Sequence, residues 1–132
     1  MSRENVEIVR RVYAEGLIDR AVESIRPLLA ADVEYVNPAE AIEPGTRNGI
    51  DAVMVAFGAV GAFEKATSEL RDLFPAGDSV VAAVTFRARS RGSDIELTQD
   101  EAHTWTFRKG KVTRFEWCRD LVSALEAVGL RE

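Results

Sequence analysis

Apolar residues recur with two different periods along the chain, a helical one in the first half and a strand-like one in the second. Spacings of three and four residues predict amphipathic helices over about residues 3–18 and 50–64, and a shorter helix that begins after Asp19. Pro27 should kink this shorter helix or divide it into two turns. The apolar stripes are Val6, Val9, Val12, Tyr13 and Leu17 in the first helix, Val22, Ile25, Leu28 and Leu29 in the second, and Ile50, Val53, Met54, Phe57 and Val60 in the third.

Alternating apolar and polar positions predict strands in the rest of the chain. The predicted strands cover residues 32–36, 67–74, 79–91 and 95–108, with one more after a turn at residues 108–111. A loop runs from the first strand to about Asn48, and Asp120 can cap a last helix. This order is typical of an α+β domain whose helices lie on one face of a sheet. A strongly twisted sheet curls, so we expect the helices on its concave side.

The stretch from Thr98 to Asp120 reads as a β-hairpin, with Gly110 supplying the positive φ of the turn. A three-residue loop with a bulge at Gly110 would place His103 opposite Phe115. A two-residue turn shifts the register by one and places His103 opposite Glu116. We favour the first register because it gathers one set of side chains on a single inward face, namely His103, Trp105, Phe107, Phe115 and Trp117.

Size, charge and cysteine content narrow the class of protein. A chain of 132 residues suits one domain, so we expect residues 1–132 to fold as a unit. Seventeen basic against 22 acidic residues leave a formal net charge of −5, which argues against general binding of nucleic acid or anionic membranes. The single cysteine, Cys118, excludes an intramolecular disulfide, and we see neither a long apolar run nor a signal-peptide pattern. We expect a cytoplasmic protein.

Five segments resemble the SnoaL-like polyketide cyclase group of the nuclear transport factor 2-like superfamily. SRENVEIVRRVYAEG is similar to its first helix, DVEYVNPAE to its first strand and loop, and NGIDAVMVAF to its third helix. AGDSVVA matches a central turn of the sheet, and EAHTWTFRKGKVTRFEW matches the signature hairpin. The resemblance implies a cone-shaped, curved antiparallel sheet with three helices on its concave face and a short C-terminal helix, a fold also called cystatin-like.

The resemblance also implies a pocket between sheet and helices, no metal or cofactor, and a homodimer formed through the sheet. The face expected to be exposed for that dimer carries Thr85, Arg87, Arg89, Thr104 and Thr106. In the cyclases a histidine and an aspartate perform acid–base chemistry. His103 matches the histidine, and Asp120 is the nearest counterpart of the acid.

Each candidate for chemistry also has a structural interpretation. An unperturbed imidazole changes charge near pH ~6.5, which suits proton transfer, but His103 could equally fill the core as a neutral ring. Asp120 is either the acid or the cap of the last helix. Glu101 shares a face with His103 by strand periodicity, so it could orient the ring, serve as the acid, or face water.

The remaining candidates concern ligand contacts. Gln99 shares the face of His103 and could bind a ligand. Tyr35 and Asn37 could polarise a carbonyl, or serve as a wall residue and a turn residue. The side chains expected to form a pocket wall, or else ordinary core, are Met54, Phe57, Phe86, Trp105 and Trp117. One histidine and one cysteine do not supply a usual zinc site.

Two functions follow from these residues. One is a cofactor-free acid–base enzyme of the cyclase, isomerase, hydrolase or dehydratase type, which uses His103 on a small apolar or carbonyl-containing molecule. The alternative is a non-catalytic module of the same fold that binds a ligand or dimerises.

Overall fold

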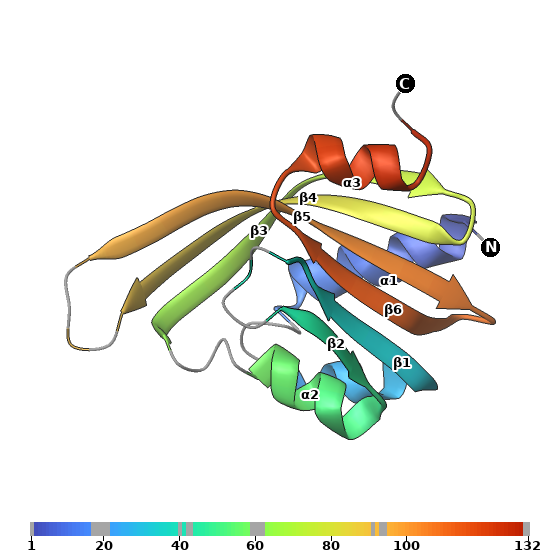
Figure 1. The fold of residues 1–132 in the computed structure, drawn as a ribbon, viewed down its shortest axis with the longest axis horizontal. Helices are drawn as coiled ribbons and strands as arrows, with labels where there is room; N and C mark the ends of the chain where they lie inside the picture. The colour runs from blue at the N-terminus through green and yellow to red at the C-terminus, as the bar shows by residue number, and fades with distance from the viewer. Residues whose placement is uncertain are drawn as a thin grey trace.

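The computed structural model describes residues 2–16, 22–39, 41, 44–58, 63–90, 92 and 95–130, and in these residues six strands form one curved sheet (Figure 1). The sheet order is β2-β1-β6-β5-β4-β3. The elements are α1 (Ser2–Ala14), the 3₁₀ helix η1 (Val22–Leu28), β1 (Leu29–Asn37), β2 (Gly45–Asn48), α2 (Ile50–Gly58), β3 (Phe63–Ala76), β4 (Ser79–Ser90), β5 (Glu96–Arg108), β6 (Lys111–Cys118) and α3 (Leu121–Ala127).

The predicted α+β architecture is confirmed, with differences in several elements. The helix expected over residues 3–18 spans Ser2–Ala14. Residues 45–48, expected to lie in a loop, form β2 and pair antiparallel with β1. The helix expected to reach residue 64 ends at Gly58, and β3 begins at Phe63. The segment around Pro27 is a 3₁₀ helix, while its expected cap Asp19 lies outside the described residues.

The first strand joins the sheet in an unexpected direction. β1 runs parallel to β6, whereas the other neighbouring strands pair antiparallel. This pairing brings Tyr35 next to Phe115, and the antiparallel hairpin brings Phe115 opposite Trp105. One row of aromatic side chains therefore crosses three strands on the same face.

The main core lies between the concave face of the sheet and the helices α1, η1 and α2. The inward positions of β4 pack against the apolar stripe of α1. Val9 and Val12 on α1 and Val80 and Val84 on β4 are fully buried, as is Trp105 on β5. Val9 and Val12 belong to the stripe that helical periodicity predicts, and their burial holds α1 on the concave side. Leu17 and Val60, also expected in stripes, lie outside the described residues, and Leu29 belongs to β1 instead of a helix.

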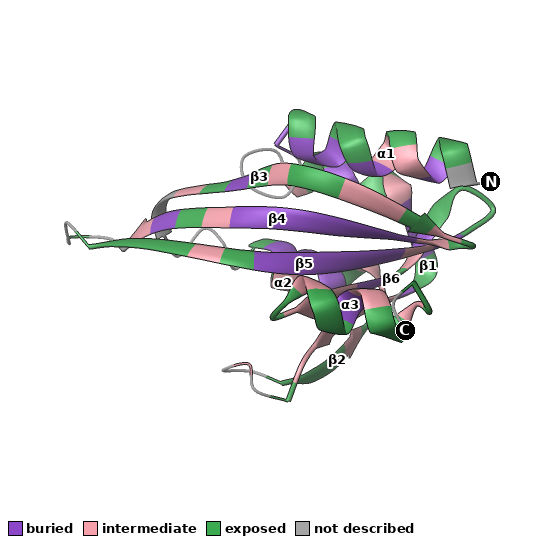
Figure 2. Cartoon of the chain, turned by 90° about the horizontal axis from the view of Figure 1, so that it is seen from above, coloured by how far each residue is buried: buried purple, intermediate pink, exposed green. Residues whose placement is uncertain are grey.

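The convex face carries α3, which packs over β4, β5 and β6 (Figure 2). Val81, Ala102 and Ala124 form a second buried cluster there. The expectation that Thr85 and Thr104 are exposed on this face is therefore wrong. Thr104 is 7% exposed and Thr85 is 6% exposed, and the Thr85 hydroxyl donates to Asp100. The homodimer through this face stays a prediction.

The hairpin register differs from both alternatives. Lys109 and Gly110 form a two-residue turn, and both have positive φ, at 53° and 77°. One extra residue in β6, Thr113, then shifts the register between Thr106 and Phe107. This bulge places His103 opposite Trp117, so the expected inward face survives although the expected pairs do not.

Candidate functional site

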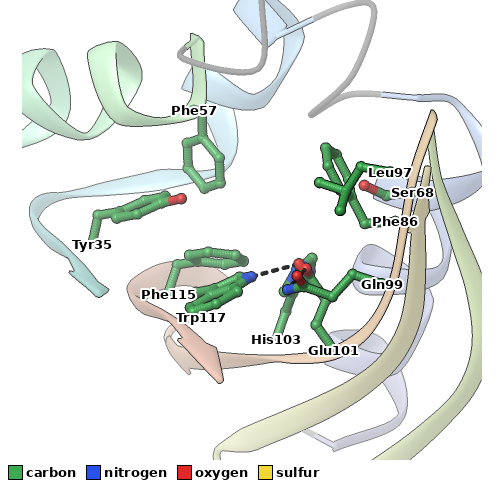
Figure 3. Close-up of a pocket in the computed structure, with 10 residues that line it drawn as sticks. All are labelled: Tyr35, Phe57, Ser68, Phe86, Leu97, Gln99, Glu101, His103, Phe115 and Trp117. Carbon is green, nitrogen blue, oxygen red and sulfur yellow. Dashed lines mark hydrogen bonds and ion pairs between the residues drawn. The ribbon is translucent and has the colours of Figure 1, made fainter. Parts of the chain in front are cut away.

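A cavity of about 210 Å³ lies between the concave face of the sheet and α2 (Figure 3). Strand β5 contributes every second residue from Leu97 to His103, because side chains on a strand alternate between the two faces. Leu97 is 45% exposed and marks the rim. The lining residues are Tyr35, Phe57, Ser68, Phe86, Leu97, Gln99, Glu101, His103, Phe115 and Trp117.

Aromatic rings form most of one wall. The Tyr35 ring lies 5.1 Å from Phe57 and 4.9 Å from Phe115, measured between ring centroids. Phe115 in turn lies 4.7 Å from Trp105, which closes this side of the cavity against the core. The contacts of Tyr35 with Phe57 and of Phe115 with Trp105 are edge-to-face, an arrangement that aromatic pairs prefer, and the rings of Tyr35 and Phe115 are tilted by 34°. The wall is therefore built mainly of packed aromatic rings.

The polar floor consists of a carboxylate and an imidazole buried side by side. Glu101 Oε2 lies 2.5 Å from His103 Nε2, and the two residues are 6% and 3% exposed. Because a carboxylate can only accept, Nε2 carries a proton and donates it to Glu101. Alternation along β5 puts the two side chains on one face. His103 faces inward as expected, and of the alternatives for Glu101 the structure has the contact with the imidazole.

Two further N–H groups bind the same carboxylate. The Trp117 indole donates to Oε2 at 2.6 Å, and the Gln99 amide donates to Oε1 at 3.1 Å. A carboxylate offers about four lone-pair positions. Among the described residues three are occupied, two on Oε2 and one on Oε1. Glu101 Oε1 therefore keeps an unused acceptor position at the floor of the cavity.

The network continues from the other ring nitrogen into the core. His103 Nδ1 lies 2.5 Å from the hydroxyl of Tyr13 on α1, and the Trp105 indole donates to that hydroxyl at 3.0 Å. Tyr13 is 7% exposed. Both nitrogens of the only histidine in the sequence are thus engaged by protein groups.

The hydroxyl of Tyr35 is another polar group of the cavity. Figure 3 shows this hydroxyl directed into the cavity, and no described residue forms a hydrogen bond with it. Burial, together with the charge of Glu101, raises the pKa of Tyr35 to about 12. At neutral pH the phenol therefore remains protonated and available as a donor.

The structure does not bring every candidate to this cavity. Met54 and Trp105 belong to the packed core, at 7% and 0% exposure, so the core interpretation holds for them. Asn37 ends β1, pairs with Gly45, and does not line the cavity. Asp120 accepts from the Ser123 amide at 2.7 Å as the N-cap of α3, on the convex side. Its hydrogen bonds with Ser123 lower the pKa of this exposed carboxyl.

Sequence reasoning also missed several residues of the site. Leu97 follows from the same alternation that identified Gln99 and Glu101, and Phe115 was predicted to face inward but was not assigned to the pocket. Ser68 enters through the pairing of β3 with β4, opposite Phe86. Tyr13 looked like one residue of a helical stripe, since nothing local indicates that it meets His103, 90 positions later in the chain.

Other chemistry has little support in the described residues. They contain no group of three or more His, Cys, Asp or Glu side chains placed to hold a metal ion. Burial raises the pKa of the Cys118 thiol to about 11, which disfavours the reactive thiolate. None of the described helices combines the length and the apolar character needed to cross a membrane.

Comparison with known proteins gives a family and several related folds. The SnoaL-like domain family matches residues 9–115. No curated protein matches the chain. Among solved structures, TerC co-crystallised with polyporic acid is 29% identical, with a TM-score of 0.72, covering 95% of this chain and 97% of that one.

Two more distant structures share the fold alone. An NTF2-like protein of unknown function from Burkholderia pseudomallei is 21% identical, with a TM-score of 0.73, and the match covers 96% of this chain and 98% of that one. A protein with a ketosteroid isomerase-like fold from Catenulispora acidiphila, in complex with trimethylamine, is 22% identical with a TM-score of 0.73, covering 94% and 93%. These likenesses agree with the fold expected from the sequence.

Proposed function

The chain belongs to the SnoaL-like domain family, and from that premise and the geometry of the cavity we propose that it binds a small, largely apolar molecule and transfers a proton on it. The observation that carries the proposal is the unused acceptor position of Glu101 Oε1 at the floor of an aromatic cavity. Apolar walls with a few convergent polar groups are the usual composition of small-molecule sites. Proton transfer by a carboxylate requires no cofactor.

The size of the cavity favours a ligand with one or two rings. A volume of about 210 Å³ exceeds the ~150 Å³ of an apolar cavity that holds benzene. It falls below the ~300–1,000 Å³ of pockets for drug-sized ligands. A polycyclic molecule would have to extend past the rim at Leu97.

The contacts favour Glu101, rather than His103, as the group that accepts the proton. Both imidazole nitrogens are engaged, whereas one acceptor position of Glu101 receives no donor from the residues that the structure describes. The carboxylate would take a proton from the carbon next to a carbonyl; the electron pair of that C–H bond would form a C=C bond, and the C=O π pair would move onto the oxygen. Tyr35 would donate a hydrogen bond to this oxygen, and in a β,γ-unsaturated ketone return of the proton to the γ carbon would complete an isomerisation.

The relative with polyporic acid supports ligand binding by this fold. TerC is 29% identical to the chain over nearly its whole length and was co-crystallised with that compound. This relative therefore supports the proposal that a protein of this fold binds an organic molecule. The identity of the ligand of this chain is a separate question.

A non-catalytic binding module remains the second candidate. It is favoured by one observation: the Nε2–H of His103, the indole of Trp117 and the amide of Gln99 all donate to Glu101. A hydrogen-bond network of this kind can stabilise the floor of the cavity without taking part in any reaction. Binding without proton exchange would support this module.

A hydrogen–deuterium exchange assay separates the two functions. One- and two-ring enolisable ketones, such as 1-indanone, are incubated with the protein in D₂O, and loss of the α-proton signal is followed by NMR. We expect the wild type to accelerate exchange and Glu101→Gln to lose about 10²–10⁴-fold of that acceleration, which is the usual contribution of a general base. Glu116→Gln is the matched control, because Glu116 lies on β6 opposite Thr104 and faces the other side of the sheet.

Ketones that bind without exchange in the wild type would contradict the proposed proton transfer. Equal acceleration by Glu101→Gln and the wild type would contradict the role of Glu101. Binding itself is checked separately by the shifts of the cavity resonances on addition of each ketone.

A further inference from the structure

The contact between α1 and the imidazole gives Tyr13 a role that the proposed function does not use. Its hydroxyl lies 2.5 Å from His103 Nδ1, and the two rings stack with centroids 5.8 Å apart and an interplanar angle of 20°. We infer that Tyr13 is a positioning residue: it holds His103 as the neutral tautomer protonated on Nε2, and thereby keeps the imidazole as a donor to Glu101. The consequence for proton transfer rests on the proposed function, but the tautomer itself does not.

The donor and acceptor roles of the neighbouring groups agree with this tautomer. The Trp105 indole can only donate, so it occupies an acceptor position of the Tyr13 oxygen. Glu101 can only accept, so the ring proton resides on Nε2. A neutral ring then presents Nδ1 as an acceptor, and the Tyr13 hydroxyl donates to it. Each of these contacts is satisfied by one consistent set of protons.

This arrangement has a consequence for the carboxylate. With Nδ1 occupied by the Tyr13 proton, the ring does not take a second proton from a ligand, so the transferred proton stays on Glu101. The hydrogen bond also fixes the rotation of the imidazole, and the Nε2–H bond keeps its direction toward Oε2. Tyr13 therefore acts through His103 and does not touch the ligand, as it is absent from the cavity lining.

The sole histidine makes the tautomer directly measurable. Protein labelled with ¹⁵N-histidine is examined at pH 7.5 by long-range ¹H–¹⁵N correlation NMR, which distinguishes protonated from unprotonated ring nitrogens. We expect one protonated nitrogen, Nε2, and one unprotonated nitrogen, Nδ1. A ring protonated on Nδ1, or on both nitrogens, would overturn the inference without any variant being needed.

The variant Tyr13→Phe keeps the ring and removes only the hydroxyl. We expect the single tautomer to be replaced by a mixture of the two, because Nδ1 loses its donor. Tyr35→Phe is the matched control, since it removes the only other tyrosine hydroxyl, which makes no hydrogen bond with His103. A Tyr13→Phe spectrum that still shows Nε2–H alone would overturn the inference, as would an equal response to Tyr35→Phe.

The exchange assay then separates this inference from the proposed function. If the wild type exchanges the ketone proton, Tyr13→Phe should lower the rate roughly tenfold, about what one neutral hydrogen bond contributes. An unchanged rate together with a changed tautomer would overturn the link to catalysis. If the wild type exchanges no ketone, the proposed function fails while the NMR result still decides the tautomer.

Discussion

The two faces of the hairpin β5–β6 hold carboxylates in opposite ways. On the concave face Glu101 is 6% exposed and receives three N–H donors from β5 and β6. On the convex side Asp120 is exposed, and its partners are the amide and hydroxyl of Ser123 in the same helix. Both residues were candidates for the acid. The difference shows that the surroundings of a carboxylate, rather than its distance along the chain from a histidine, decide its use.

The largest expected effect is on the buried carboxylate. Glu101→Gln places amide hydrogens against the donors of His103 and Trp117, so it should lower the free energy of unfolding by about 1.5–3 kcal/mol, the range for hydrogen bonds to a charged group. Urea denaturation of the purified variant measures this. Glu116→Gln should change stability by no more than ~0.5 kcal/mol. Equal stability of Glu101→Gln and wild type would mean that the network does not hold the floor together.

A second test concerns the thiol of Cys118 on the convex side and compares its reactivity in the native and the unfolded protein. Burial raises the pKa of Cys118 from 9.0 to about 11, so the thiolate fraction at pH 8 should be about a hundredfold smaller than in the unfolded chain. Iodoacetamide should therefore alkylate the native protein much more slowly than the protein in urea. Because the folded state favours the thiol, this group's contribution to stability is present below pH 9 and is lost as the pH rises toward 11. Similar rates in native and unfolded protein would contradict the burial of this sulfur.

The exposed carboxylate should respond to acid. Hydrogen bonds from Ser123 lower the pKa of Asp120 below 3.8, so its contribution to stability is present above that pH and is lost as the pH falls through the lower value. Asp120→Ala should be less stable than wild type at pH 7, and this difference should shrink near pH 3. Asp120→Asn should lose less at pH 7, because Asn also caps helices. Thermal unfolding at both pH values provides the measurement, and a difference that grows in acid would reverse the assigned sign.

The smallest effect on stability is expected for the Tyr35 hydroxyl, which has no hydrogen-bond partner in the part of the chain that the structure describes. Tyr35→Phe should change the free energy of unfolding by no more than ~0.5 kcal/mol, because it removes no hydrogen bond seen in the described residues. It should nevertheless weaken binding of a carbonyl ligand, which a ketone titration followed by NMR would show. A loss of several kcal/mol in stability would indicate a structural role for this hydroxyl instead.

Much of the fold could be predicted because its signals are local. The apolar stripes of α1 and the alternation of β4 and β5 follow from helix and strand periodicity, and the inward face of His103 followed from period two. The register could not be predicted in the same way, since the bulge at Thr113 is a property of two paired strands. β2 was missed because GTRN has no apolar alternation, and only its pairing with β1 makes it a strand.

The amino-acid order alone therefore specified the helices, the strands and the face on which the imidazole lies, because each depends on neighbours within a few positions. The partners of that imidazole came from folding: Tyr13 reaches it from a helix 90 residues away, and Trp117 reaches Glu101 from the opposite strand. Hydrogen bonds act only over about 3 Å. Whether two distant side chains come that close depends on helix packing and strand register, which periodicity does not encode.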